Sequence, residues 1–172
     1  ARAGVGVDNI DVAAATRSGI VVMNTPSGNS VSAAEHTIAL MLALARRISI
    51  ADATMKAGGW DRNKFVGTEV AGKTLGVIGL GRIGREVARR AHGMDMEIIV
   101  LDPFVTAARA AELGYTTAAS LDELLPKVDF VTVHVPLSAE TKSLIGAREL
   151  GLMKKTARVL NVARGGIIDE KA

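Results

Sequence analysis

Cysteine is absent from the 172-residue sequence, and aromatic side chains account for only 3% of it. Without cysteine, neither a disulfide framework nor thiolate chemistry is available, and the composition fits a protein of the reducing cytoplasm. With few aromatic residues, the core has to be built from aliphatic side chains, and hydrophobic residues make up 48% of the chain. Such a composition suits a parallel sheet of Val and Ile covered by Ala- and Leu-rich helices.

Long runs of like charge and long charge-free helical stretches are missing as well. The formal net charge is +3, but no five like charges follow one another, so we expect no nucleic-acid partner. The longest charge-free helical stretch, residues 37–45, is too short to cross a bilayer, so we expect no membrane partner. No spacing of His and carboxylates indicates a metal site. No secretory signal is visible at residue 1. Because the chain lacks an initiating Met and begins inside what looks like an ordered segment, we interpret it as a piece of a longer protein.

Apolar runs recur along the chain, and most are followed by a helical pattern. The runs 19–24, 74–79, 97–102, 130–135 and 157–163 predict strands, and the middle ones are apolar enough for a sheet covered on both faces. Helices are predicted over 82–91, 107–113 and 120–127, the last with Ser120 and Glu123 at capping-box spacing. Strands that alternate with helices predict an α/β fold with a doubly wound parallel sheet.

The first part of the chain has a different pattern. Residues 24–29 are dense in turn formers and precede a long helix predicted over 33–56, with Ser32 and Glu35 at capping-box spacing. This helix is apolar almost all round as far as Leu44, so it must be buried on more than one side, by a second domain or a second subunit. We therefore interpret residues 1–24 as the tail of a neighbouring domain and residues 25–172 as the main domain.

Gly79, Gly81 and Gly84 have the spacing G-x-G-x-x-G between the predicted strand 74–79 and the predicted helix 82–91. In this context the first glycine allows a tight turn, the second lets the backbone approach a pyrophosphate, and the third lets the helix pack closely on the strand. The next strand ends at Asp102, whose carboxylate can accept both ribose hydroxyls and repels a 2′-phosphate. The pattern predicts a Rossmann-type domain that prefers NAD to NADP; a glycine-bearing turn with a surface Asp is the alternative.

Two further side chains fall where predicted strands end, at the edge where open α/β sheets bind ligands. Arg164 follows the strand 157–163 and precedes two glycines that leave room for a substrate. Its guanidinium could bind a carboxylate or lie solvated in a turn, and the residues alone leave both readings open. His134 could act as an acid/base, but we prefer a histidine packed against the sheet edge.

The chain resembles the D-2-hydroxyacid dehydrogenases in five stretches that run through nearly all of it. These are AGVGVDNID (3–11), NTPSGNSVSAAEHTIALMLALAR (24–46), GTEVAGKTLGVIGLGRIGREVARR (67–90), VTVHVPL (131–137) and NVARGGIIDE (161–170). The resemblance implies NAD-dependent oxidation of a D-2-hydroxyacid to a 2-keto acid. The leading substrate is 3-phospho-D-glycerate, as in serine biosynthesis. Reduction of glyoxylate or hydroxypyruvate is an alternative, and a non-catalytic, NAD(H)-sensing corepressor is another.

The resemblance also implies roles for single residues. Residues implied to contact the cofactor are Gly79, Gly81, Arg82, Ile83, Gly84, Asp102, Val135, Val162, Ala163 and Arg164. The backbone amides of Val5, Gly6 and Val7 are implied to hold the substrate carboxylate. Arg164 matches the family's catalytic arginine, which orients that carboxylate and polarises the keto oxygen.

Two expectations about the whole protein follow from the same resemblance. The family's acid/base histidine and its supporting glutamate would lie beyond Ala172, so we expect this chain alone to turn over little or no substrate. The family arrangement places the long helix at the junction of the domains and at a twofold interface, so we expect a homodimer or tetramer formed through residues 30–60.

Overall fold

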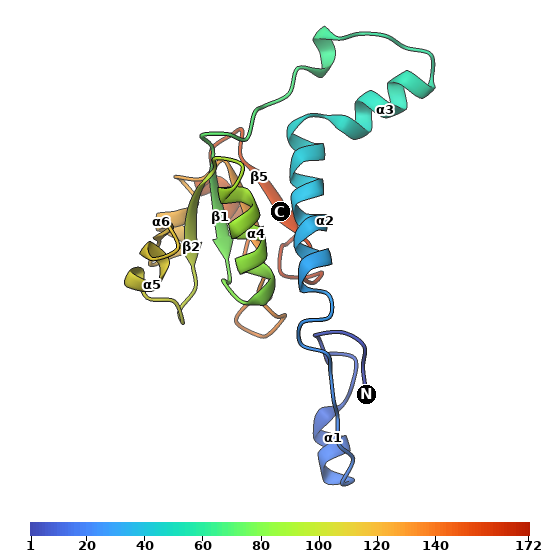
Figure 1. Cartoon of the computed structure of the whole chain (residues 1–172), viewed down its shortest axis with the longest axis vertical. Coiled ribbons are helices and arrows are strands. Elements are labelled where there is room, and N and C mark those ends of the chain that lie inside the picture. Colours follow the sequence, from blue (N-terminus) through green and yellow to red (C-terminus); the bar gives the residue numbers. More distant parts are fainter.

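The computed structural model describes all 172 residues, and an α/β body contains most of them (Figure 1). Five parallel strands form one sheet in the order β3-β2-β1-β4-β5. Their bounds are β1 Thr74–Ile78, β2 Glu97–Leu101, β3 Thr116–Thr117, β4 Phe130–Val133 and β5 Arg158–Asn161. The chain winds outward from β1 to β3 and then crosses back to β4. This order confirms the predicted doubly wound sheet of the Rossmann type.

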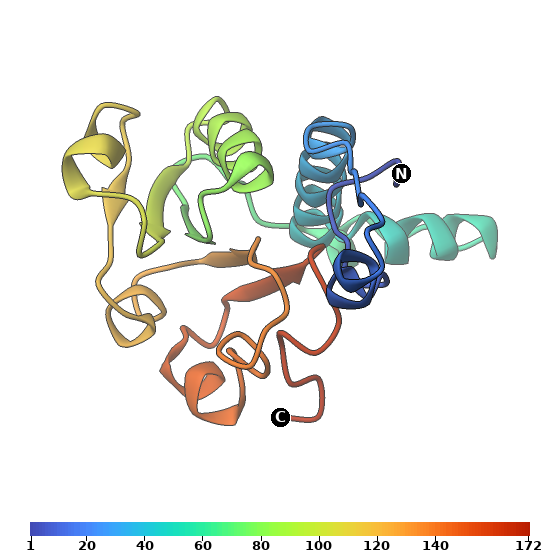
Figure 2. The same cartoon turned by 90° about the horizontal axis from the view of Figure 1, so that it is seen from below.

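Helices cover both faces of the sheet. Their bounds are α1 Val12–Arg17, α2 Ser30–Ala45, α3 Ile48–Lys56, α4 Arg82–His92, α5 Ala107–Ala111, α6 Leu121–Leu124 and α7 Ala147–Leu152, with a 3-10 turn at Asn63–Phe65. Seen from below, α2 (blue) and α4 (green) lie on one side of the sheet and α7 (orange) on the other (Figure 2). None of the helices combines the length and the apolar character needed to cross a membrane.

The core consists of two apolar clusters, one on each face of the sheet. Leu75 and Val77 of β1 belong to the cluster that includes α2 and α4, whereas Ile78 belongs to the cluster beneath α6. Successive side chains of a strand point to opposite faces, so a strand covered on both sides has to be apolar throughout. Phe130 is the only aromatic residue among the largest fully buried side chains, in agreement with the predicted aliphatic core.

The predicted strand 19–24 is wrong. This stretch has only the first residues of the chain beside it, and the two are joined by a single bridge between Arg2 and Asn24. Ile20, Val21 and Met23 are exposed. A strand needs a continuous ladder of hydrogen bonds with a neighbour, and an apolar sequence alone does not provide one. Two short helices, α1 and α7, and the two-residue strand β3 were not predicted.

The predicted single helix over 33–56 is also wrong, because two helices occupy this range. The first begins at Ser30, and Ser32 donates its hydroxyl to the carbonyl of Asn29 instead of capping the helix. Arg47, with φ of 55°, adopts the left-handed conformation between α2 and α3. A left-handed residue cannot continue an α-helix, so α3 leaves the axis of α2 and projects from the body (Figure 1).

Within this chain α2 is buried on one side only. The side that packs on α4 contains the buried residues Ala34, Thr37, Met41 and Ala45. Across this contact, Nη2 of Arg90 in α4 lies 3.7 Å from Oε1 of Glu35. On the remaining surface of α2, Leu40 and Leu44 are 43% and 47% exposed. The second covering surface that the sequence predicts for this helix is therefore not provided by the chain itself.

The predicted cap of α6 can be compared with the structure. Ser120 caps α6 as predicted, because its hydroxyl accepts from the Glu123 amide at 3.2 Å. The capping box is incomplete, however, because the Glu123 carboxylate accepts from the amide of Ala119 and not from that of Ser120. At the C-terminal end of α4 the chain turns through Asp95, which is left-handed with φ of 59°.

Candidate active site

The carboxyl ends of β1, β2, β4 and β5 lie at one edge of the sheet, because the strands are parallel. At this edge lies a cavity of about 650 Å³ whose lining includes the N-termini of α2 and α4 and the loop of residues 5–8. Ten of the thirteen residues predicted for the site line the cavity: Val5, Gly6, Val7, Gly81, Arg82, Ile83, Val135, Val162, Ala163 and Arg164. Gly79, Gly84 and Asp102 do not line it. Gly79 and Asp102 lie in the loops after β1 and β2, and Gly84 lies in the first turn of α4.

The glycine loop after β1 lies against neighbouring main chain. Gly79 has φ of 90°, and a Cβ at this position would lie 2.7 Å from the carbonyl oxygen of His134. A Cβ on Gly84 would overlap the carbonyl oxygen of Gly79, so α4 packs on the loop at backbone distance. By contrast, a Cβ on Gly81 would have no atom within 4 Å. The loop is therefore closed on the protein side and open on the side of the cavity.

The first turn of α4 presents free backbone amides. Gly81 is the N-cap and has no side chain to accept from them, and the amides of Arg82, Ile83 and Gly84 donate to no atom of the chain. The N-terminus of a helix carries partial positive charge and binds anions such as phosphate. Because Gly81, Arg82 and Ile83 line the cavity, this end of it suits a pyrophosphate.

Asp102, directly after β2, is fixed by two backbone amides. Its Oδ2 accepts from Leu80 at 2.7 Å and its Oδ1 accepts from Phe104 at 2.8 Å. Each carboxylate oxygen retains lone-pair capacity, so the group can still accept hydrogen bonds from ribose hydroxyls. Its fixed negative charge disfavours a phosphate at the same place. The residues present therefore fit NAD, with the pyrophosphate at α4 and the adenosine ribose at Asp102.

Arg164 lies in a turn after β5 that Asn161 holds together. The Asn161 side chain accepts from the Ala163 amide at 3.0 Å and donates to the carbonyl of Arg164 at 2.8 Å. The guanidinium forms an ion pair with Asp8, in which Nη2 lies 2.9 Å from Oδ1. Hydrogen bonds from Arg164 hold the pKa of the Asp8 carboxyl below its usual value. The turn and the ion pair together fix the guanidinium at the cavity wall.

The loop of residues 5–7 also lines the cavity, directly beside Arg164. The carbonyl of Val5 accepts from the Asn24 side chain at 2.8 Å, and the carbonyl of Val7 accepts from Ile10 at 2.9 Å. The amides of Val5, Gly6 and Val7 donate to no atom of the chain. The free amides and the adjacent guanidinium provide donors for a carboxylate.

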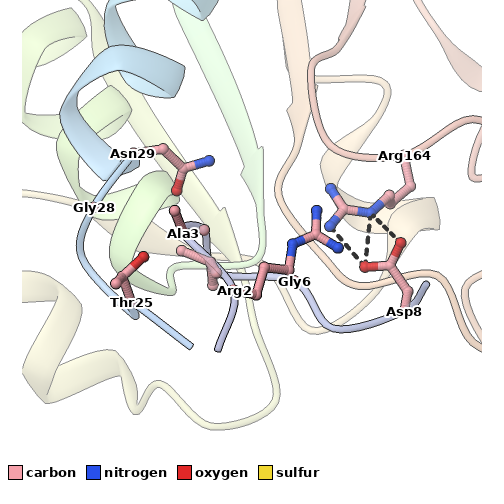
Figure 3. A pocket seen from close by; sticks show the side chains of 10 residues that line it. Arg2, Ala3, Gly6, Asp8, Thr25, Gly28, Asn29 and Arg164 are labelled. Atoms are coloured by element: carbon pink, nitrogen blue, oxygen red, sulfur yellow. Dashed lines mark hydrogen bonds and ion pairs between the residues drawn. The ribbon is translucent and has the colours of Figure 1, made fainter. Parts of the chain in front are cut away.

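A second cavity, of about 540 Å³, adjoins the first (Figure 3). Five residues line both: Val5, Gly6, Asp8, Asn29 and Arg164. Arg2 lines only the second cavity, where it donates to the side chain of Asn9. The two cavities therefore share a wall made by the Asp8–Arg164 pair, and a cationic side chain lies on the far side of it.

His134 also lines the first cavity, so both readings of its position can be compared with its surroundings. Its Nε2 lies 3.0 Å from the hydroxyl of Thr132, which is itself fully buried. Burial lowers the pKa of His134 to about 4, so the ring is neutral near pH 7. A neutral ring bonded to a buried hydroxyl agrees with the preferred reading, a histidine packed at the sheet edge.

Asp8, Asn29, Ser30 and His134 line the main cavity and were not among the predicted site residues. For Asp8 no local signal exists, because its partner Arg164 lies 156 positions away. Ser30 and Asn29 begin α2, and only the position of that helix beside α4 brings them to the cavity.

Comparison with known proteins agrees with this geometry. Residues 38–172 match the family model described as D-isomer specific 2-hydroxyacid dehydrogenase, NAD binding domain. The chain is 54% identical to a D-3-phosphoglycerate dehydrogenase of Synechocystis sp. and 53% identical to one of Methanocaldococcus jannaschii, in each case over 99% of this chain. These alignments cover 31% and 33% of the relatives, so the chain spans about a third of their length.

Solved structures of similar fold include other members of this group. A glyoxylate reductase from Paecilomyes thermophila is 40% identical with a TM-score of 0.88, over 98% of this chain and 51% of that one. The D-lactate dehydrogenase of Escherichia coli is 32% identical with a TM-score of 0.87, over 98% of this chain and 53% of that one. The similarity in fold thus extends across relatives whose names differ in substrate.

The lowered pKa of His134 predicts a pH dependence of stability. As the pH falls from 6.5 towards 4, this histidine takes up a proton in the unfolded chain but not in the folded one, so stability is lost. The difference between 6.5 and about 4 corresponds to about 3 kcal/mol at full effect. We expect His134→Gln, which does not titrate, to lose less free energy of unfolding over this range. Denaturant titrations of the unmodified chain and of His134→Gln at several pH values measure the free energy of unfolding. If this free energy falls equally with pH in both proteins, the prediction is wrong.

Proposed function

The chain belongs to the D-isomer-specific 2-hydroxyacid dehydrogenases, and we propose that it is the NAD-binding part of a D-3-phosphoglycerate dehydrogenase. The proposed reaction oxidises the C2 hydroxyl of 3-phospho-D-glycerate to the keto group of 3-phosphohydroxypyruvate. One observation carries the proposal: the free amides at α4, Arg164 and the amides of residues 5–7 all line one cavity. Phosphate-binding and carboxylate-binding donors thus border the same space, in which a cofactor and a substrate would meet.

Several groups of the chain would hold the cofactor. We assign the pyrophosphate to the amides of Arg82 and Ile83 and the adenosine ribose to Asp102. Val135 and the turn of residues 162–164 would border the nicotinamide half. When bound, NAD supplies the hydride acceptor. The protein's part is to position the substrate's C2 beside it and to keep water away.

The substrate carboxylate would lie against the loop of residues 5–7 and the adjacent Arg164. The amides of this loop donate to the carboxylate, and Arg164 donates to it and places positive charge beside the C2 oxygen. Stabilisation of this kind contributes several kcal/mol when it acts on charge that develops in the transition state. His134 is a poor acid/base because its pKa is about 4. The family resemblance implies a histidine–glutamate pair outside these 172 residues, and we propose that this pair transfers the proton.

Arg2 favours a phosphorylated acid over a smaller one. It lines the second cavity, which the Asp8–Arg164 pair separates from the first. A substrate bound by its carboxylate at Arg164 could extend a second anionic group towards Arg2. Glyoxylate has no such group, so the reduction of glyoxylate is the second candidate. Its support is the 40% identity with a glyoxylate reductase. The third candidate, a corepressor that senses NAD(H), would bind the cofactor in the cleft but would not turn over a substrate.

We further propose that residues 1–24 belong to the substrate domain and residues 25–172 to the NAD-binding domain. In support, no residue before Ser30 is buried, and this segment lies apart from the sheet (Figure 1). We also propose that α2 and α3 join two copies of the chain. In support, residues 30–60 include a group of exposed apolar side chains: Val31, Leu40, Leu44, Ile48, Ile50, Met55 and Trp60. A cytoplasmic location stays a prediction.

Cofactor choice is the first test. The purified chain is titrated with NADH and, separately, with NADPH, followed by nicotinamide fluorescence. We expect saturable binding that prefers NADH, and binding about 10- to 100-fold weaker in Asp102→Ala, which loses charged hydrogen bonds to the ribose. Thermal unfolding of the variant verifies that it is folded. Equal affinity of the unmodified chain for both cofactors would contradict the assignment of Asp102.

Substrate choice is tested in the full-length enzyme. We expect oxidation of 3-phospho-D-glycerate with NAD, and a kcat/KM for D-glycerate that is lower by at least about tenfold, because the second anionic group is missing. Arg2→Ala should remove most of this preference and change D-glycerate oxidation little. If the unmodified enzyme prefers D-glycerate or reduces glyoxylate more efficiently, the phosphoglycerate assignment is wrong. The 172-residue chain alone is expected to show little or no turnover.

The interface is tested by sedimentation of the full-length enzyme. We expect Leu44→Glu combined with Ile48→Glu to lower the sedimenting mass, because two charges would have to be buried in the proposed interface. Leu113→Glu, which also places a charge on an exposed apolar side chain but lies outside residues 30–60, is the control. An unchanged mass in the double variant would exclude these helices as the interface.

A further inference from the structure

The Arg164 guanidinium is held along one of its two bidentate edges. Nε lies 3.3 Å from both carboxylate oxygens of Asp8, and Nη2 lies 2.9 Å from Oδ1. Nη1 donates to the carbonyl of Ala163 at 2.8 Å. A guanidinium has five N–H groups in a fixed plane, so one N–H on Nη1 and one on Nη2 remain. The Nε–Nη2 edge is thus occupied, whereas the Nη1–Nη2 edge retains donors for a second carboxylate.

We propose that Asp8 is a positioning residue: its carboxylate accepts hydrogen bonds from the Nε–Nη2 edge of Arg164 and leaves the Nη1–Nη2 edge for the substrate carboxylate. This inference rests on the proposed function and adds a residue to it. Arginine has several rotatable bonds, and an arginine that is held in one orientation loses less entropy when it binds a substrate. Asp8 would therefore act through Arg164 and would not need to touch the reacting atoms.

Gly6 lies in direct contact with this pair. A Cβ at this position would overlap Nη2 of Arg164 and would lie 2.5 Å from Oδ1 of Asp8. Any side chain at residue 6 would therefore displace one partner. The backbone of the loop that is proposed to hold the substrate carboxylate thus passes directly beside the ion pair, and the loop, Asp8 and Arg164 form one unit.

A contribution to folding stability alone does not explain the Asp8–Arg164 ion pair. The side chains of Arg164 and Asp8 are 41% and 60% exposed, and ion pairs this exposed contribute little to folding. The pair between Asp122 and Arg148 is comparable, with a shortest distance of 2.6 Å and similar exposure. It borders neither of the two cavities. Removal of that pair is therefore a matched control.

The test is a double-mutant cycle in the full-length enzyme, with Asp8→Ala, Arg164→Ala and both together. We expect Asp8→Ala to raise KM for 3-phospho-D-glycerate about tenfold or more, while the Kd of NADH changes less than about twofold. In the Arg164→Ala background the same substitution should cost nothing further, because Asp8 acts only through the arginine. Asp8→Asn, which keeps an acceptor, should give an intermediate KM, and Asp122→Ala should leave KM unchanged.

A second measurement does not depend on turnover. In the ¹⁵N spectrum of the 172-residue chain, the Nε–Hε signal of Arg164 is identified by its loss in Arg164→Lys. We expect slow exchange of this proton with water, and exchange several-fold faster in Asp8→Ala, because the carboxylate that accepts it is gone.

The outcomes separate this inference from the proposed function. An unchanged or lower KM in Asp8→Ala, or an equal loss in the Arg164→Ala background, overturns the positioning role. An Nε–Hε that exchanges equally fast with and without Asp8 overturns it as well. If the unmodified enzyme does not oxidise 3-phospho-D-glycerate, the proposed function fails. The cycle is then measured with the 2-hydroxyacid that the enzyme does oxidise, and the exchange rate tests the Asp8–Arg164 contact independently.

Discussion

The close approach of the N-terminal end of α4 to the loop after β1 is the constraint on which the cleft depends. It requires that residue 84 have no side chain, because a Cβ there would overlap the Gly79 carbonyl. The first amides of α4 have no acceptor within the chain, and their residues line the cavity. A larger residue at position 84 would push the helix outward and remove the anion site, although the sheet itself could still form.

The rest of the site follows from the parallel register of the sheet. Ile78 is paired with Leu101 and with Val133, and Val133 is paired with Asn161. The residues that follow these four positions therefore reach the same edge, although they come from distant parts of the sequence. Asp102, His134 and Arg164 are brought there by the backbone, and only short loops are needed to present them. This explains why a small number of loops can carry most of the chemistry of the fold.

Local patterns predicted most of the sheet and the glycine loop, because a buried strand and a tight turn are specified by neighbouring residues. The long helix was predicted less well: its apolar sequence gave no sign of the left-handed Arg47 that ends α2. Residues 19–24 have the composition of a strand but no partner ladder within the chain. The Asp8–Arg164 pair joins positions too far apart for any spacing rule. The roles of Val5, Gly6 and Val7 came from family resemblance alone, since three small or aliphatic residues carry no chemical signal.

The N-terminal segment is attached to the rest of the chain in few places. Apart from the peptide connection and the bond from the Thr25 amide to the Gly4 carbonyl, its only hydrogen bonds to later residues are those between Asp8 and Arg164. A segment attached by so few bonds can rotate about residues 24–29 at low cost. Gly6 and Asp8 border both cavities, so any such rotation would change the shape of both. It would also move the carboxylate that holds Arg164, so the shape of the cleft and the orientation of its arginine depend on the same few bonds.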